Sequence, residues 1–277
     1  MIGRLVSLLK AAISGNQAPP LTYGSPVAQG RVVLSDSTWQ QPLPETSSAA
    51  RSTLVRAVAS HVEARDAIRT LVAIDGRTAA GKTTFGHEIA GALARQGLTV
   101  LRASLDDFKH PWRDRHLYDR ESGEGYYRNA FDYENLVGLL LEPFRTGAAG
   151  GVALCSIDPL TQVDHSATRV PAPEGAVLVV DGVFAQRPEI DRWWDLRIWL
   201  DVDAHHSVGR GTRRDHARVG AEAASLHRDR YGVAEDIYVR ETDPVSRADV
   251  VVDNRDFDAP HLIRCPDAGQ LDRPRAP

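Results

Sequence analysis

The sequence predicts an α/β fold, in which a parallel β-sheet is covered by helices on both faces. Short runs of Val, Leu and Ile recur along the chain without the alternation of a half-exposed strand, which is typical of strands buried on both faces. Segments with helical spacing separate these runs, and strands that alternate with helices favour a parallel sheet. At 277 residues, with 42% hydrophobic and 25% charged residues, the chain can bury a substantial core.

The first 47 residues are expected to form an extension of helix and loop rather than a second domain. The opening stretch, MIGRLVSLLKAAISG, predicts an amphipathic helix packed on the body rather than a signal peptide, because Lys10 interrupts its apolar region. Residues 15–47 are rich in Pro, Ser, Gln and Gly and contain one strand-like island, RVVL. We therefore predict an arm over 1–47 and one main domain over 48–265.

The main domain is expected to begin with a helix and then to alternate strands and helices. Apolar residues recur at helical spacing from residue 48 onward, at Leu54, Val55, Val58, Val62 and Ile68. The predicted strands are 71–75, 98–105, 151–157, 176–182, 196–202 and 248–254. The predicted helices centre on 82–95, 133–145, 187–194 and 203–230, and the tail, 266–277, is expected to be disordered.

A phosphate-binding motif follows the first of these strands. GRTAAGKT matches G-x-x-x-x-G-K-[ST], between a predicted strand and a predicted helix. The glycines allow the backbone N–H groups to point inward, and the helix adds its N-terminal dipole. Lys82 is expected to reach the β- and γ-phosphates of ATP, and Thr83 to ligate Mg²⁺. The predicted ATP-binding residues are Gly76, Arg77, Thr78, Ala79, Ala80, Gly81, Lys82, Thr83 and Thr84. The motif predicts a P-loop NTPase fold.

The chain lacks the sequence motifs that mark several other classes of nucleotide-binding protein. It has no asparagine-lysine-x-aspartate base reader of a guanine-nucleotide switch and no G-x-G-x-x-G of a dinucleotide enzyme. Motor and transport ATPases usually carry two acidic residues after VLVV, where this chain has Asp181 and a glycine. A net charge of −4 gives no reason to expect nucleic acid or a membrane as the main partner. Two cysteines, Cys155 and Cys265, favour reduced thiols in the cytoplasm.

Two adjacent carboxylates follow the second predicted strand, in the stretch RASLDDFKHP. Carboxylates at the carboxyl end of a strand next to the phosphate strand face the ligand crevice of such a sheet. One of them is in a position to accept a hydroxyl proton as that oxygen attacks the γ-phosphate. The alternative is that Asp106 and Asp107 only cap a turn.

Several further motifs occur in a characteristic order. They are Asp106-Asp107-Phe108 as D-x-F, Ala130-Phe131-Asp132 as AFD, IDPLTQVDH with Asp158 and His165, VLVVDG with Asp181 in place of a glutamate, RGTRRD with Arg210, Arg214 and Asp215, and ADVVVDN. This order resembles the uridine kinase and phosphoribulokinase branch of the P-loop small-molecule kinases. The resemblance runs from about residue 68 to 255.

The resemblance implies an ATP·Mg²⁺-dependent kinase with a helical lid, which the charged segment after IWLDVD would form. It implies catalytic roles for Asp106, Lys82, Arg210 and Arg214 and metal ligation by Thr83 and Asp181. The substrate-binding residues would be Asp106, Phe108, Phe131, Asp158 and His165. Tyr126 and Tyr127 are added as candidates from the residues themselves, which either stack on a substrate ring or only cover a loop.

The acceptor side departs from the family pattern. Tyr126 and Tyr127 stand where uridine-cytidine kinases have an acid and a histidine, and Ile157 replaces a tyrosine. A nucleoside such as uridine or cytidine leads as acceptor, followed by a modified nucleoside, a pantothenate-like compound or a sugar phosphate. A P-loop ATPase that serves as a regulatory module without a small-molecule acceptor is the alternative class. The sequence leaves the oligomeric state open, a homo-oligomer included.

Overall fold

The computed structural model describes residues 30–39, 47–65, 67–117 and 119–266, in which seven strands form one sheet of order β1-β3-β4-β2-β5-β6-β7. The strands are β1 (Val32–Leu34), β2 (Thr70–Gly76), β3 (Val100–Ser104), β4 (Val177–Asp181), β5 (Leu196–Asp201), β6 (Val250–Asp253) and β7 (His261–Arg264). All are parallel except β7. The predicted α/β fold with a parallel sheet is confirmed. The predicted N-terminal helix and the predicted tail from 267 onward lie outside the described residues.

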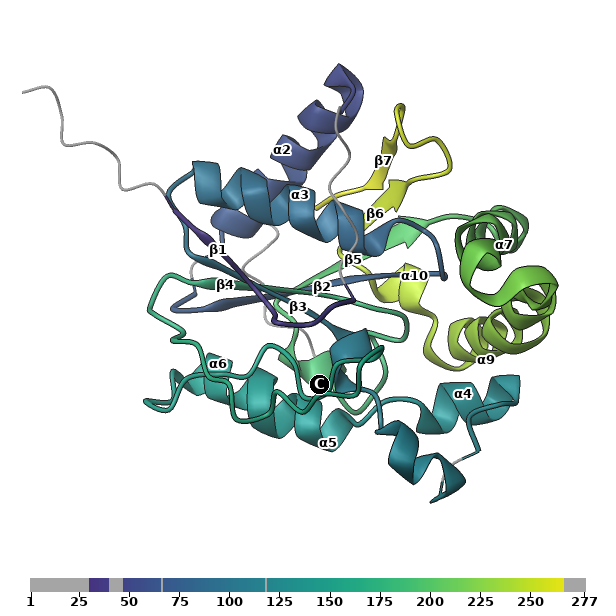
Figure 1. The fold of residues 1–277 in the computed structure, drawn as a ribbon. Coiled ribbons are helices and arrows are strands. Elements are labelled where there is room, and N and C mark those ends of the chain that lie inside the picture. Colours follow the sequence, from purple (N-terminus) through teal and green to yellow (C-terminus); the bar gives the residue numbers. More distant parts are fainter. Residues whose placement is uncertain (1–29, 40–46, 66, 118, 267–277) are drawn as a thin grey trace, which may run out of the picture.

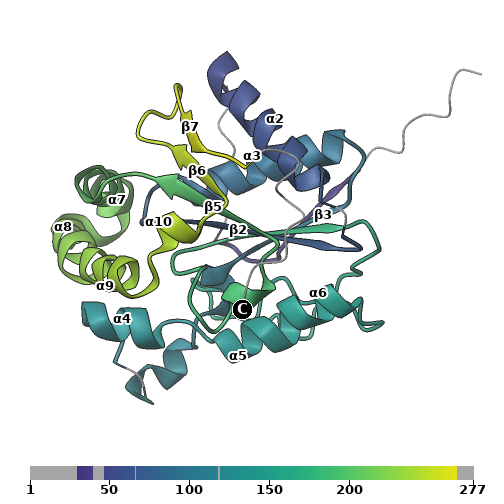
Figure 2. The same cartoon turned by 180° about the vertical axis from the view of Figure 1, so that it is seen from behind.

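Helices cover both faces of this sheet, as Figures 1 and 2 show. One face carries α2 and α3, and the other carries α5 and α6. Beside the sheet, α7, α8 and α9 form the helical segment predicted as a lid, and α4 packs against α9. The bounds are α2 (Ala49–Glu63), α3 (Lys82–Arg95), α4 (Gly123–Asn129), α5 (Tyr133–Leu136), α6 (Glu142–Thr146), α7 (Ala204–Val219), α8 (Ala223–Ser225), α9 (Val233–Thr242) and α10 (Pro244–Arg247).

The strand β2 lies at the centre and divides the core into two layers. Leu71 and Ala73 contribute to the hydrophobic cluster on the side of α5 and α6, and Val72 and Ile74 to the cluster on the side of α2 and α3. Successive side chains of a strand point to opposite faces, so an uninterrupted apolar run is required when both faces are covered. Among the described residues, no helix is both long and apolar enough to cross a membrane.

Three local predictions are wrong. The apolar run 151–157 forms no strand; it makes single bridges and is buried as an irregular segment, with Ala153 N–H donating to the carbonyl oxygen of Leu139 at 2.9 Å. Apolar runs of this length fit several buried conformations, so periodicity alone does not separate them. Ile68 follows the end of α2 and is 68% exposed. Of the predicted helix 187–194, only the turn Asp191–Trp193 is helical.

The strand-like island of the arm belongs to the sheet. It forms β1 at the edge, parallel to β3, with Val32 opposite Val100 and Leu34 opposite Arg102. Val33 packs against the core, whereas Val32 and Leu34 are exposed. The described part of the N-terminal extension therefore extends the central sheet.

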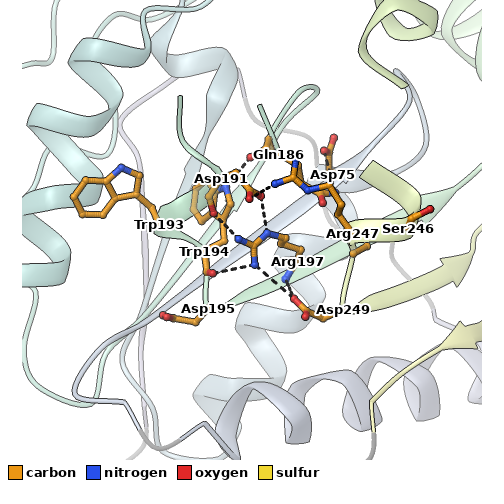
Figure 3. A network of polar contacts seen from close by, with 12 residues as sticks. Asp75, Gln186, Asp191, Trp193, Trp194, Asp195, Arg197, Ser246, Arg247 and Asp249 are labelled. Carbon is orange, nitrogen blue, oxygen red and sulfur yellow. Dashed lines mark hydrogen bonds and ion pairs between the residues drawn. The ribbon is translucent and has the colours of Figure 1, made fainter. Parts of the chain in front are cut away.

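A buried polar network lies at the start of β5, around Arg197 (Figure 3). The guanidinium donates through Nε to Asp191 Oδ1 at 2.6 Å and through Nη1 to the carbonyl oxygen of Trp194 at 3.1 Å. Asp249 accepts from the backbone N–H of Arg197 at 2.8 Å, and Arg247 also pairs with Asp191. The Arg197 side chain is only 4% exposed, so protein groups rather than water compensate its charge.

Candidate active site

The P-loop connects the end of β2 to the start of α3 through a turn that side chains would obstruct. Gly76 and Gly81 have φ values of +147° and +94°, in the region that favours glycine. A Cβ on Gly76 would meet the carbonyl oxygen of Leu200 at 2.7 Å, and one on Gly81 would meet Asn254 Nδ2 at 2.8 Å. Lys82 is buried and donates through Nζ to the carbonyl oxygen of Gly76 at 3.0 Å. The loop therefore curls around the lysine.

The back of the P-loop is braced by an arginine from α2. Arg51 is fully buried and forms a bidentate ion pair with Glu88 of α3, at 2.8 and 2.7 Å. Its Nη1 donates to Asn254 Oδ1 at 3.0 Å, and Asn254 Nδ2 donates to the carbonyl oxygen of Ala80 at 2.6 Å. The helix before β2 and the residue after β6 thus hold the loop in place.

The helices after β5 contact the P-loop directly. Glu235 of α9 accepts from the backbone N–H of Thr78 at 2.5 Å and from Arg77 Nη1 at 3.3 Å. Ser207 of α7 donates through Oγ to the carbonyl oxygen of Thr78 at 2.7 Å. Glu235 and Ser207 are both buried, so a movement of these helices would be transmitted to the loop.

Thr83 and Asp181 lie side by side and form a donor set suited to Mg²⁺. Thr83 Oγ1 donates to Asp181 Oδ2 at 2.7 Å, and Arg102 Nη2 donates to Asp181 Oδ1 at 2.7 Å. Asp181 ends β4 and is 2% exposed, so the ion pair fixes its carboxylate. A hydroxyl and a carboxylate oxygen are ligands that Mg²⁺ prefers, and the residues present therefore fit the metal expected with ATP.

A cavity of about 560 Å³ joins the P-loop to the segments that follow β3 and β5. The site residues predicted from the sequence that line this cavity are Thr78, Ala79, Gly81, Lys82, Thr83, Thr84, Asp106, Tyr126, Asp181, Arg210 and Arg214. Seven Lys and Arg side chains line it, against four Asp and Glu side chains. This excess of positive charge favours an anionic ligand.

Asp106 lies in the helical turn after β3, and both of its carboxylate oxygens have partners. Lys109 Nζ lies 2.5 Å from Oδ1, and Trp39 Nε1 donates to Oδ2 at 3.1 Å. Burial alone would raise the pKa of Asp106, but the positive charges of Lys109, Lys82 and Arg214 hold it below its ordinary value. The carboxylate is therefore ionised at neutral pH and acts as a hydrogen-bond acceptor.

The adjacent Asp107 does not line the cavity. Its side chain is buried and accepts from Ser35 Oγ at 3.0 Å. Burial raises the pKa of Asp107 to about 7, and the nearby carboxylates of Asp106 and Asp181 add to the rise. The pKa values of two neighbouring aspartates thus shift in opposite directions, because cations in the cavity offset burial at Asp106 whereas burial dominates at Asp107.

The two predicted lid arginines both line the cavity from α7. Arg214 forms a bidentate pair with Asp215 at 2.9 and 3.1 Å, and His227 Nε2 lies 2.8 Å from the same carboxylate. Arg210 donates to the carbonyl oxygen of Asn254 at 3.1 Å. Both guanidinium groups are thereby oriented by protein acceptors at the cavity wall.

Two neighbouring tyrosines of α4 have different surroundings. Tyr126 lines the cavity, with ring centroids 6.1 Å from Phe131 and 6.0 Å from Phe184. Tyr127 instead packs in the core, 5.2 Å from Phe184, with the Arg187 guanidinium 4.4 Å from its ring centroid. Only the first of the pair can contact a ligand in this cavity.

The other four residues predicted to bind the acceptor do not line the cavity. Phe108 and Phe131 are buried in the core beneath it. Asp158 is buried and accepts from the backbone N–H of Thr38 at 2.6 Å. His165 lies outside the cavity and is partly exposed. The aromatic residues thus support the cavity wall, and Asp158 supports the arm.

Several cavity residues were missed by sequence reasoning. They include Trp39, Lys109, Arg120, Arg230 and Tyr231. Lys109 directly follows the D-x-F motif, and its spacing of three residues from Asp106 is compatible with the ion pair that the two side chains form. For Trp39 no local signal existed, because 67 positions separate it from Asp106.

A separate group of residues that could hold a metal ion lies away from the cavity. Asp203, His205 and His206 are exposed at the start of α7, with ligand atoms within 4.8 Å of one another. Asp203 is the N-cap of α7 and accepts from the backbone N–H of His206 at 3.0 Å. Capping of the helix accounts for the position of this carboxylate.

A glycine-rich loop between β2 and α3, at the carboxyl end of a parallel sheet, defines a P-loop nucleotide-binding protein. The chain belongs to the Phosphoribulokinase / Uridine kinase family, which it matches over residues 71–256. The kinase resemblance inferred from the motifs is thereby confirmed, and the family implies an ATP-dependent phosphotransferase. No curated protein gives a significant match.

Many solved structures resemble the chain, two of which illustrate the similarity. A possible uridine kinase from Bacillus stearothermophilus is 26% identical, with a TM-score of 0.56, and the match covers 71% of this chain and 96% of that one. A candidate fructose transport system kinase from Silicibacter sp. TM1040 is 21% identical, with a TM-score of 0.57, and the match covers 68% and 93% of the two chains. The second similarity concerns the fold alone.

Proposed function

We propose that this protein transfers the γ-phosphoryl group of ATP to a hydroxyl of a small molecule, with a uridine- or cytidine-like nucleoside as the leading acceptor, phosphorylated at its 5′-hydroxyl. The observation that carries the proposal is that the P-loop and Asp106 line one cavity. They follow β2 and β3, which flank β4 in the sheet. A phosphoryl donor and a hydroxyl acceptor can therefore meet between them.

Each group in the cavity has a defined role in this reaction. The P-loop amides and Lys82 bind the phosphates, and Arg210 and Arg214 stabilise the charge that spreads over the phosphoryl oxygens during transfer. Thr83 and Asp181 would hold Mg²⁺, which when bound would neutralise more of that charge.

Asp106 accepts a hydrogen bond from the attacking hydroxyl and aligns it. Its lowered pKa makes it a weak base. Because the transition state of phosphoryl transfer is loose, the attacking hydroxyl keeps its proton until late in the transfer. The carboxylate of Asp106 therefore first aligns the hydroxyl and then accepts its proton.

The aromatic side chains of the cavity favour a nucleoside acceptor. Tyr126 and Trp39 both line the cavity that contains Asp106, and an aromatic ring is a surface on which a base can stack. A related solved structure carries the description of a possible uridine kinase. ATP as the donor and the two free thiols, Cys155 and Cys265, fit a cytoplasmic enzyme.

A phosphate-bearing sugar is the second candidate acceptor, because three cationic side chains line the cavity on the Asp106 side. They are Lys109, Arg120 and Arg230. An acceptor panel separates the candidates: ADP formation is measured with nucleosides, sugars, sugar phosphates and pantothenate. Stimulation by one class identifies the acceptor. ATP hydrolysis that no compound changes would instead support a P-loop ATPase without a small-molecule acceptor.

The variant Asp106→Asn tests the role of the carboxylate. We expect transfer to the identified acceptor to fall by about 10²–10⁴-fold, because the amide cannot accept the hydroxyl proton, while the Kd for ATP changes little. The measurements are ADP release and ATP binding by calorimetry. The matched control is Asp107→Asn, which keeps an acceptor oxygen for Ser35 and should retain transfer. Wild-type transfer by Asp106→Asn would refute the assignment.

A further inference from the structure

The arm reaches the ligand edge of the sheet because β1 is parallel to β3. In a parallel pair, both strands end at the same edge, so the residues after Leu34 emerge beside those after Ser104. Gly30 precedes β1 at a close approach, where a Cβ would clash with the carbonyl oxygen of Leu98. The topology therefore brings residues 35–39 next to the segment that carries Asp106.

Within residues 35–39 of the arm, three residues donate to three carboxylates of the main domain. Ser35 Oγ donates to Asp107 at 3.0 Å, and the backbone N–H of Thr38 donates to Asp158 at 2.6 Å. Trp39 Nε1 completes the set with its 3.1 Å contact to Asp106. Hydrogen bonds to carboxylates that are largely withdrawn from water are among the stronger polar contacts in proteins. The arm is thus docked through specific polar contacts.

Trp39 is the residue of this set that reaches the cavity. Its indole and Lys109 hold the two oxygens of Asp106 from opposite segments of the chain. A carboxylate oxygen has two lone pairs, so Oδ2 can accept from the indole and from an acceptor hydroxyl at once. The ring face adds a rigid, largely apolar wall to the same part of the cavity.

We propose that Trp39 is a positioning and specificity residue of the acceptor site, an inference that rests on the proposed function. Its indole N–H orients the Asp106 carboxylate toward the acceptor hydroxyl, and its ring packs against a flat or apolar face of the acceptor. The residue lies outside the segment that matches the family, 71–256, so this chain supplies part of its acceptor site from its own N-terminal arm.

Two variants separate the contributions of the N–H and of the ring. Trp39→Phe retains a ring without the donor, and we expect kcat to fall about tenfold with little change in the acceptor KM. Trp39→Ala also removes the wall, so the acceptor KM should rise about tenfold as well. The KM for ATP should stay constant in both. The matched control is Trp193→Ala, since Trp193 is also partly buried but lies outside the cavity. Kinetics of Trp39→Ala equal to those of Trp193→Ala would overturn the proposal.

A measurement that does not depend on activity tests the contact itself. The five tryptophans give five indole N–H signals in an NMR spectrum, and the signal lost in Trp39→Phe identifies Trp39. Asp106→Asn should shift this signal and leave in place that of Trp193, which Trp193→Phe identifies in the same way. A Trp39 signal that does not move refutes this inference whether or not the enzyme is active. Failure of the wild-type protein to phosphorylate any acceptor would refute the proposed function instead.

Discussion

Two charged networks lie at opposite ends of the parallel strands, and they differ in what compensates their charges. At the start of β5, Arg197 donates through Nε, Nη1 and Nη2 to protein acceptors at 2.5–3.1 Å, as the dashed lines of Figure 3 show in part. At the other end, Lys82 donates, within the described part of the chain, to carbonyl oxygens of its own loop at 3.0 and 2.8 Å, and its side chain lines the cavity.

The comparison shows how one fold uses charge for two purposes. A buried arginine whose donors all have protein partners holds secondary structure elements together, and its removal takes part of the compensating charge from the carboxylates around it. Cations that line a cavity keep part of their hydrogen-bonding capacity for a ligand. Substitutions at the two ends should therefore separate loss of stability from loss of activity.

The largest expected effect is on activity, from Lys82→Met. We expect transfer to fall by about a thousandfold or more, because the phosphate charge loses its main compensating side chain. The thermal midpoint should shift by less than about 3 °C, since the lysine stem is replaced by one of similar length. ADP release measures the rate of transfer, and calorimetry measures the thermal midpoint of unfolding. Full unfolding of the variant would contradict the comparison, because Lys82 would then be needed for stability as Arg197 is.

The next effect is on stability, from Arg197→Met. We expect the free energy of unfolding to fall by about 3 kcal/mol, because Asp191 and Asp249 lose a buried partner. Transfer by the folded variant should be unchanged at low temperature. Denaturant titration measures the loss. Arg255→Met is the control, as Arg255 pairs with Asp253 in an exposed position, and its midpoint should match the wild type. Equal midpoints for both variants would contradict the prediction.

The smallest expected effect is the contribution of Asp107 to the pH dependence of the free energy of unfolding. Because its pKa is raised to about 7, above that of the unfolded chain, the folded state binds more protons between about pH 4 and 7. Its contribution to stability therefore falls as pH rises through this window. Asp107→Asn removes this dependence. Its free energy of unfolding should therefore rise relative to that of the wild type by about 1 kcal/mol for each unit of pH between pH 5 and 6.5.

The control for this measurement is Asp158→Asn. Hydrogen bonds from Thr38, Leu160 and Thr161 hold the pKa of Asp158 below its ordinary value, although burial opposes them. Its contribution is complete above the unfolded pKa, so the variant should show a constant loss over pH 5–6.5. Parallel pH profiles for the two variants would show that Asp107 does not titrate as described.

What could be predicted from the sequence depends on how local each signal is. The P-loop is a contiguous motif, and five of the six predicted strands exist because buried parallel strands need uninterrupted apolar runs. The same signal fails at 151–157, where a buried irregular segment has an equally apolar composition. The position of Asp106 after the second strand places it in the cavity, because parallel strands share one carboxyl edge.

Contacts between residues far apart in the sequence could not be predicted from local sequence patterns. Arg51, Asn254 and Glu235 support the P-loop from positions far apart in the sequence, and nothing in the residues around them indicates a partner. The difference between Tyr126 and Tyr127 follows from which side of a short helix faces the cavity, and that depends on how α4 packs against α9. Sequence spacing alone does not determine such packing.

The edge strand β1 also bears on how copies of this protein behave toward one another. Unpaired backbone groups along a sheet edge are a template for pairing with another chain, and short outer strands are one way to limit it. Here the outermost strands have three and four residues, β1 and β7, and β1 covers the five-residue edge of β3. A protein shortened to begin after residue 40 would expose that edge and present it for aggregation.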